Sequence, residues 1–344
     1  MDQNKPKRRM RYSGKYPKKF EEKYKEKQPE KYQDIIEHVM NKGNTPAGMH
    51  RSIMVDEILG FLDIQPYQVG LDATLGFGGH SKAILEQLNY TGHLHGIDVD
   101  PIELPKTHQR LIDAGFTEHE FTLHNMNFSD FDLIDIKGFD FIIADLGVSS
   151  MQIDDPKRGF TYKFEGPLDL RMNPDIGVSA SKRLNELSQA EIEGMLVENA
   201  DEIYAKEIAL EITKAKAQGE LIETTKDLYF IIKRALNHLS KATREEAIKK
   251  ASQRTFQALR IDVNHEYEAL YEFLEKIPNR LNKGGKVAIL SFHSGEDRLV
   301  KKAFQYYQRQ GVYNFVSGPD LPSYDEIHNN PRARSAKLRC AIKS

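Results

Sequence analysis

The chain has 344 residues, of which 39% are hydrophobic and 29% charged, with a net charge of -2. At about 150 residues per domain this length allows about two domains with buried cores, and the composition excludes a largely disordered, collagen-like or coiled-coil protein. The sequence contains no apolar stretch near the roughly 18 residues of a membrane helix and no signal peptide, and its single cysteine, Cys340, excludes an intrachain disulfide. We therefore expect a cytoplasmic protein without a membrane partner or a metal site.

The small net charge hides an uneven distribution. Residues 1–20 contain eight lysines and arginines against a single acid, Asp2, so a basic arm precedes a mildly acidic body. Such an arm is typical of contact with nucleic-acid phosphates, although a solvated tail that only aids solubility has the same composition. A Gly/Pro/Asn-rich linker at residues 41–48 predicts a flexible arm over residues 1–45.

Helical and extended patterns alternate along the first part of the body. Apolar residues at helical spacing predict a helix near residues 53–62. Short apolar runs predict strands at residues 69–73, 94–98, 121–124 and 139–145. Helical patterns separate the first three strands, and this β-α-β-α-β order predicts an α/β protein with a doubly wound, mostly parallel sheet.

The alternation then stops. Residues 179–250 are rich in Ala, Glu, Lys, Leu and Ile and poor in Gly and Pro, which predicts a helical insertion. A long helix is expected over residues 257–282, ended by Gly284-Gly285, with a fifth strand over residues 286–292. The sheet is therefore expected to be interrupted by a helical domain and then resumed.

A glycine-rich turn after the first strand carries the sharpest local signal. The turn runs from Gly76 through Gly78-Gly79-His80 into a helix, and Asp98 ends the second strand 22 residues after Gly76. This spacing is typical of an acid that binds the ribose hydroxyls of an adenosine-type cofactor. A turn with a purely structural role has the same local sequence.

Two details favour S-adenosylmethionine over a nicotinamide dinucleotide. Ser81 stands where a third fingerprint glycine is expected, and His80 crowds the helix N-terminus at which a pyrophosphate binds. A sulfonium cofactor carries no phosphate, so neither feature opposes it. No phosphate-binding P-loop motif occurs in the sequence. A nicotinamide dehydrogenase remains an alternative at this point.

Longer motifs follow in chain order. They are DLGVSSMQIDDPKRGF at residues 145–160, GPLDLRM at 166–172, FQALRIDVN at 256–264, SFHS at 291–294 and RSAKLR at 334–339. With the glycine turn, they resemble the bacterial 16S rRNA (cytosine-N4)-methyltransferase H family, the MraW-like enzymes, over about residues 50–339. The resemblance implies a Rossmann-like class I methyltransferase fold with an inserted helical domain, S-adenosyl-L-methionine as cofactor, and methylation of a decoding-centre cytidine of 16S rRNA, within the small ribosomal subunit.

The resemblance also implies a domain division and a set of site residues. The methyltransferase domain is expected over residues 46–165 and 253–344, and the inserted substrate-recognition domain over residues 166–252. Cofactor binding is assigned to Gly78, Gly79, His80, Asp98, Phe128, Asp145 and Gln152. Phe128 would flank the adenine, although ordinary core packing explains that residue equally well. The oligomeric state stays open, a homodimer included.

The chemistry of cytosine separates two methyl acceptors. Carbon C5 becomes nucleophilic only after a thiolate adds to the ring, and Cys340 lies four residues from the end of the chain, so the exocyclic N4 amine is the expected acceptor. Catalytic roles are predicted for Asp145, Asp169, Arg171 and His293. For Asp169 and Arg171 a structural ion pair is the alternative, and for His293 a plain loop histidine. Phe160, Tyr162 and Phe164 are candidates for a base-stacking platform.

Three departures from the family pattern concern the substrate side. They are the basic arm, Gly295 after the SFHS motif, and the sequence ENADE at residues 198–202. A divergent paralogue that methylates a different cytidine would fit them. A protein of another class, a catalytically inactive RNA-binding or ribosome-assembly factor on the same fold, is the second alternative.

Overall fold

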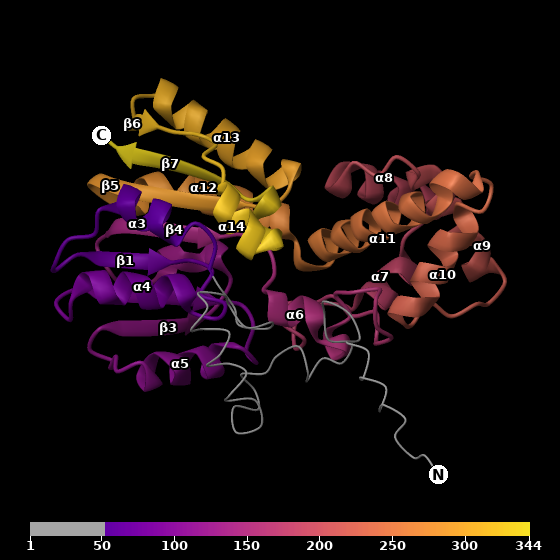
Figure 1. Cartoon of the computed structure of the whole chain (residues 1–344), viewed down its shortest axis with the longest axis horizontal. Helices are drawn as coiled ribbons and strands as arrows, with labels where there is room; N and C mark the ends of the chain where they lie inside the picture. Colours follow the sequence, from indigo (N-terminus) through magenta and orange to yellow (C-terminus); the bar gives the residue numbers. More distant parts are fainter. Residues whose placement is uncertain (1–51) are drawn as a thin grey trace, which may run out of the picture. The chain divides into compact units, whose positions relative to one another are not determined.

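A seven-stranded sheet forms the body of the protein in a computed structural model that describes residues 52–344 (Figure 1). The strands are β1 (Val69–Asp72), β2 (His93–Asp98), β3 (Phe121–Asn125), β4 (Phe139–Asp145), β5 (Leu281–Ser291), β6 (Tyr313–Val316) and β7 (Lys337–Lys343). Their order is β3-β2-β1-β4-β5-β7-β6, with β1 to β5 parallel and β7 antiparallel to both its neighbours. The predicted α/β fold is confirmed, whereas the predicted arm lies outside the described residues.

Helices cover both faces of the sheet, because successive strand residues point to opposite sides. In β4, Phe141 and Ile143 face one apolar cluster, and Ile142 and Ala144 face the other. The first cluster is covered by α3 (Val55–Leu62), α4 (Gly79–Leu88) and α5 (Leu104–Asp113). The second is covered by α12 (Glu266–Arg280), α13 (Ser294–Arg309) and the 3-10 segment η2 (Phe128–Leu133). Burial on both faces explains why residues 141–144 of β4 are all apolar.

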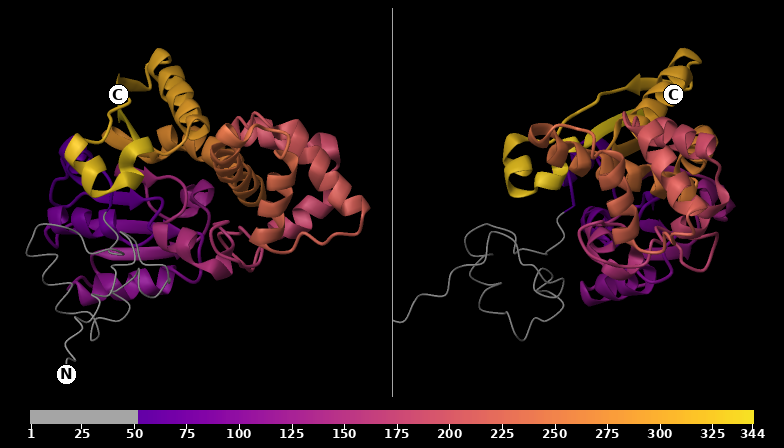
Figure 2. Two further views of the ribbon diagram at one scale, coloured as in Figure 1. Left: turned by 45° about the vertical axis from the view of Figure 1, so that its right-hand side comes forward. Right: turned by 90° about the vertical axis from the view of Figure 1, so that its right-hand side faces the viewer.

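The helical insertion has an apolar core of its own. Its helices are α7 (Ala180–Glu186), α8 (Gln189–Ala200), α9 (Ala205–Ala217), α10 (Thr225–Ala235) and α11 (Lys241–Asn264), which gather beside the sheet (Figures 1 and 2). The apolar cluster that they share extends from Phe160 to Leu259. The expected domain boundary at residue 252 therefore falls inside α11, and the division into domains stays a prediction.

The expected single helix over residues 257–282 is wrong. The chain breaks between α11 and α12 at His265, which has a left-handed φ of 50°, and α12 ends at Arg280. Strand β5 then begins at Leu281, and Gly284-Gly285 lie inside it, where the pairing with β4 shifts register. The two glycines therefore form a bulge within a strand rather than a helix stop.

The C-terminal strands β6 and β7 were not predicted from the sequence, because β6 has only four residues and charged residues interrupt the apolar pattern of β7. Arg339 in β7 is nevertheless buried, since its Nε donates to Oδ1 of Asp297 in α13 over 2.7 Å. The helix α14 (Tyr324–Asn329) and the 3-10 segment η4 (Pro331–Ser335) precede β7. Within residues 52–344, no helix is long and apolar enough to cross a membrane, and no three His, Cys, Asp or Glu side chains are grouped to hold a metal ion.

Candidate active site

Carboxyl groups end three neighbouring strands of the sheet. Asp72 is the last residue of β1, Asp98 of β2 and Asp145 of β4. These strands are adjacent and parallel, so the three side chains lie at the same edge. The order of the strands reverses between β1 and β4, and open α/β sheets bind ligands outside the carboxyl ends of their strands at such a point. The candidate site therefore lies at this edge.

The predicted glycine turn joins β1 to α4 at this edge. The N–H group of Gly76 donates to Oδ2 of Asp98 over 2.8 Å. Gly78 has a φ of 85°, a left-handed conformation that favours glycine, and a Cβ there would lie 2.7 Å from the methyl carbon of Thr107. Helix α4 begins at Gly79. The structure thus places Gly78 and Gly79 in a tight turn that is anchored to Asp98.

Asp98 is held by backbone groups on both of its oxygens. Besides the Gly76 contact, the N–H group of Asp100 donates to Oδ1 over 2.8 Å. Burial raises the pKa of Asp98 to about 7, and the nearby charge of Asp100 adds to this shift, against the hydrogen bonds from Asp100 and Gly76. The carboxyl group is therefore half ionised near neutral pH, where hydrogen-bond donors such as ribose hydroxyls favour its charged form.

Asp145 and His80 face each other across the turn. Nδ1 of His80 lies 3.7 Å from Oδ2 of Asp145, and its Nε2 lies 3.0 Å from the carbonyl oxygen of Ile53. Burial raises the pKa of Asp145 to about 6; His80 opposes the shift, and the charges of Asp72 and Glu296 add to it. A carboxyl group with a pKa in this range can accept a hydrogen bond or hold a proton at neutral pH.

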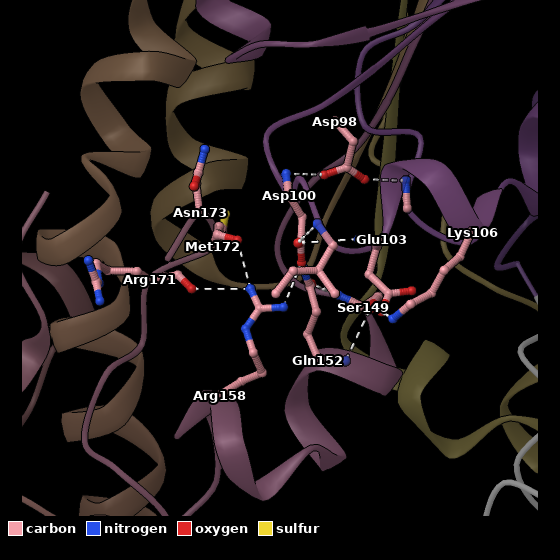
Figure 3. Close-up of polar contacts among 12 residues, drawn as sticks. Asp98, Asp100, Glu103, Lys106, Ser149, Gln152, Arg158, Arg171, Met172 and Asn173 are labelled. Carbon is pink, nitrogen blue, oxygen red and sulfur yellow. Dashed lines mark hydrogen bonds and ion pairs between the residues drawn. The ribbon is translucent and has the colours of Figure 1, made fainter. Parts of the chain in front are cut away.

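A second layer of polar contacts surrounds Asp100 (Figure 3). Asp100 is fully buried, and its Oδ2 accepts hydrogen bonds from Nε2 of Gln152 over 2.7 Å and from Nη1 of Arg158 over 2.8 Å. Gln152 belongs to α6 (Ser150–Asp154) and forms a capping box with Ser149. Arg158 ends the 3-10 segment η3 (Pro156–Arg158). Gln152, predicted as a cofactor ligand, thus supports the turn after β2.

Asp169 and Arg171 form a bidentate ion pair. Nε of Arg171 lies 2.7 Å from Oδ1 of Asp169, and its Nη2 lies 2.8 Å from Oδ2. Burial opposes ionisation of Asp169, but the hydrogen bonds from Arg171 outweigh it and lower the pKa. The structure therefore contains the ion pair that is the structural alternative to catalytic roles for these two residues. Arg158 joins this pair to the turn after β2 at residues 98–100, here called the cofactor turn. Its Nη1 donates to Asp100, and its Nη2 donates to the carbonyl oxygens of Arg171 and Met172 (Figure 3).

Phe128 and His293 lie on the flanks of the strand edge. Phe128 begins η2 after β3, and its ring packs edge to face on Phe273 at 5.2 Å, so core packing explains the contact that the structure shows. His293 precedes α13 after β5, and its Nε2 lies 3.0 Å from Oε1 of the buried Glu296. The charge of Glu296 contributes to the raised pKa of Asp145. His293 is thus linked to the strand edge through a carboxylate.

The three aromatic candidates for base stacking differ in exposure. Phe160 is buried in the core of the insertion and offers no free ring face. Tyr162 stacks on Tyr229 of α10, with ring centroids 5.7 Å apart and an interplanar angle of 3°. Phe164 is partly buried. Tyr229 therefore covers one face of the Tyr162 ring.

Three residues of the site were missed from the sequence. Asp72 has the same signal as Asp98, an acid at the end of an apolar run, and its Oδ2 accepts a hydrogen bond from Ser81 over 2.6 Å. Asp100 lies two residues after Asp98 and reads as a turn residue. Arg158 carries no sequence signal for its contact, because 58 residues separate it from Asp100.

The chemistry of this edge fits a sulfonium nucleoside. Asp98 ends β2 at this edge with a carboxylate, the kind of group that accepts hydrogen bonds from ribose hydroxyls. The carboxyl groups of Asp72 and Asp145 beside the glycine turn favour an ammonium or sulfonium cation and oppose a pyrophosphate. The donor set therefore fits S-adenosylmethionine and disfavours the nicotinamide alternative.

Comparison with known proteins gives consistent matches. A family model described as the MraW methylase family matches residues 47–344. Ribosomal RNA small subunit methyltransferase H 2 of Acholeplasma laidlawii is 69% identical over 100% of both chains. Ribosomal RNA small subunit methyltransferase H 1 of Agathobacter rectalis is 56% identical, over 100% of this chain and 99% of its own. A relative from Prochlorococcus marinus named ribosomal RNA small subunit methyltransferase H is 40% identical, over 85% of this chain and 95% of its own.

Proposed function

The chain belongs to the MraW methylase family, and on that premise we propose that it methylates the exocyclic N4 amine of a decoding-centre cytidine in 16S rRNA. The observation that carries the proposal is the group of strand-end carboxyls, Asp98 and Asp145, on either side of the glycine turn. The names of the relatives, which specify ribosomal RNA of the small subunit, support the substrate.

The methyl donor of this family of methylases is S-adenosylmethionine. The bound cofactor supplies an electrophilic methyl group on a sulfonium. We assign its ribose to Asp98, its methionine end to Gly78, Gly79 and His80, and its adenine to Phe128. Gln152 acts on this site through Asp100, whose backbone N–H group holds Asp98.

Asp145 is the residue proposed to act on the acceptor amine. A cytosine N4 amine is a weak nucleophile because its lone pair is delocalised into the ring. A carboxylate that accepts a hydrogen bond from one of its N–H groups increases the electron density on the nitrogen. The pKa of about 6 leaves Asp145 mostly ionised at neutral pH. When the cofactor is bound, the new N–C bond would form as the S–CH3 bond breaks and leaves its electron pair on the sulfur, and Oδ2 of Asp145 would receive the proton that the amine loses.

Asp169, Arg171 and His293 are proposed to serve the substrate side. The Asp169–Arg171 pair leaves a fifth or more of each side chain exposed, at the start of the insertion. His293 holds Glu296 beside Asp145, so it influences the acceptor site through charge rather than through contact. The helical insertion is proposed to recognise the RNA, and the enzyme is placed in the cytoplasm, where ribosomal subunits are assembled.

The only cysteine argues against methylation of carbon C5. Cys340 is buried in β7, and burial raises the pKa of its thiol to about 12. A thiol with this pKa stays protonated at neutral pH and cannot add to the cytosine ring as a thiolate. Direct attack by the N4 amine needs no such nucleophile.

Nucleoside mass spectrometry of small-subunit rRNA tests the proposal. RNA from a strain without the gene is compared with RNA after treatment by the purified enzyme or by its Asp145→Asn variant. We expect N4-methylcytidine only with the wild-type enzyme, at one decoding-centre position. The appearance of 5-methylcytidine would contradict the assignment, and cofactor binding without any methylation would favour the inactive assembly factor.

A further inference from the structure

Arg158 contacts two parts of the molecule that have different roles in the proposed enzyme. Its Nη1 donates to Oδ2 of Asp100, in the turn that follows the ribose-binding Asp98. Its Nη2 donates to the carbonyl oxygens of Arg171 over 3.2 Å and Met172 over 2.7 Å, in the segment on the substrate side. One planar guanidinium thus bridges the cofactor turn and residues 169–173 (Figure 3).

The Asp100–Arg158 pair is buried, with 0% and 10% of the side chains exposed. Removing two charges from water opposes folding, so a buried ion pair is weak grounds for a role in stability and is better attested as a device for conformational specificity. Here the carboxylate is fully engaged: Oδ1 accepts from Ile102 N–H, and Oδ2 accepts from Gln152 and Arg158. The position of the guanidinium is therefore set by the cofactor turn.

The segment that Arg158 holds is strained. Leu170 has a φ of 63°, a left-handed conformation that is unfavourable for a branched side chain. Such residues persist only where the surroundings fix them, and they concentrate at functional sites. Asn264 fixes this segment from the other side, since its Nδ2 donates to the Leu170 carbonyl oxygen and its Oδ1 accepts from Met172 N–H. The segment is clamped between Arg158 and the end of α11.

From this geometry we propose that Arg158 is a positioning residue that couples the two sites, so that an occupied cofactor site strengthens RNA binding at residues 169–173. The inference rests on the proposed function, because it assigns those residues to the RNA side. When a ligand on Asp98 fixes the turn, Asp100 and Arg158 fix the carbonyl oxygens of Arg171 and Met172. The coupling is reciprocal, so bound RNA strengthens cofactor binding by the same factor.

Calorimetry with S-adenosylhomocysteine measures this coupling without turnover. Its affinity is determined alone and with unmethylated small ribosomal subunits for the wild type, Arg158→Gln and Arg158→Lys. For the wild type we expect the subunits to tighten binding on the order of tenfold, within the usual range of coupling between sites. In Arg158→Gln this gain is lost. Arg158→Lys keeps a charge beside Asp100 but not the planar fork, so it retains thermal stability and still loses the gain.

Lys157→Gln is the matched control, because it removes an exposed neighbouring charge, and it keeps the full gain. With saturating subunits present, the KM of Arg158→Lys for S-adenosylmethionine should rise about tenfold, whereas its cofactor affinity without subunits changes little, a split that a merely structural role would not produce. A wild-type enzyme without the gain, or an Arg158→Lys enzyme that keeps it, overturns the inference. N4-methylcytidine formation by the wild type is scored separately, so failure of the proposed function is recognised on its own.

Discussion

Asp98 accepts hydrogen bonds from Gly76 and Asp100 and, in the proposed site, from the ribose hydroxyls of the cofactor. Asp98→Ala should therefore weaken S-adenosylhomocysteine binding by about 1–3 kcal/mol, the usual contribution of hydrogen bonds to a charged group. Isothermal calorimetry measures the change, with Asp113→Ala, an exposed acid of α5, as the control. An affinity equal to that of the wild type would remove Asp98 from the cofactor site.

The raised pKa of Asp98 predicts a pH dependence of cofactor binding. Ribose hydroxyls donate to the ionised carboxylate, so affinity should rise between pH 6 and 8 with a midpoint near the pKa of about 7. In Asp98→Asn the rise through pH 7 should disappear. A wild-type affinity that is flat across this range would show that the carboxylate does not face the ribose.

The same pKa acts on the stability of the unliganded protein in the opposite direction. Because the folded pKa of about 7 lies above the ordinary 3.8, Asp98 stabilises the fold fully below pH 3.8, and this contribution is lost as the pH rises through 7. Cofactor binding thus restores stability at the pH where the empty site is least favourable.

At the scale of elements, the backbone at the end of η3 packs very closely against residues 166–169. A Cβ on Gly159 would lie 2.2 Å from the carbonyl oxygen of Pro167 and 2.9 Å from the Asp169 nitrogen. Gly177 is a matched control, because its φ of 74° nearly equals the 75° of Gly159 while no atom lies within 4 Å of an added Cβ.

Gly177→Ala should lower the free energy of unfolding by about 1 kcal/mol, the penalty for a left-handed alanine. Gly159→Ala should lower it by about 2 kcal/mol more, since backbone atoms cannot move aside cheaply, and should also reduce methylation because this close packing places Arg158 and residues 169–171. Urea denaturation measures both. Equal losses in the two variants would mean that the close approach is unimportant.

At the scale of the whole molecule, the basic arm is tested by truncation. Removing residues 1–20 deletes eight cations that would displace counterions from RNA, so RNA affinity should fall and its salt dependence should flatten. Truncation at Asn44 should leave cofactor affinity and thermal stability nearly unchanged, because the family match begins at residue 47. A steep salt slope that survives truncation would assign RNA binding to the folded body instead.

The sequence by itself determined the features that depend on local pattern. The order of strands and helices up to β4, the glycine turn and Asp98 all follow from periodicity and from short spacings along the chain. The helices of the insertion were predicted for the same reason, although the break at His265 was missed, because one left-handed residue hardly changes an apolar period of 3.6.

Only the tertiary structure decided which distant residues meet. Arg158 reaches Asp100 across 58 residues, and Asn264 holds Leu170 across 94, and no local pattern encodes such contacts. Strand β7 pairs with β5 although Arg339 breaks its apolar run, since Asp297 of α13 neutralises that charge. Burial likewise raised the pKa of Asp98 and Asp145, which sequence reasoning identified only as acids. The sequence identifies the titratable groups, whereas their desolvation and their long-range pairing depend on the assembled fold.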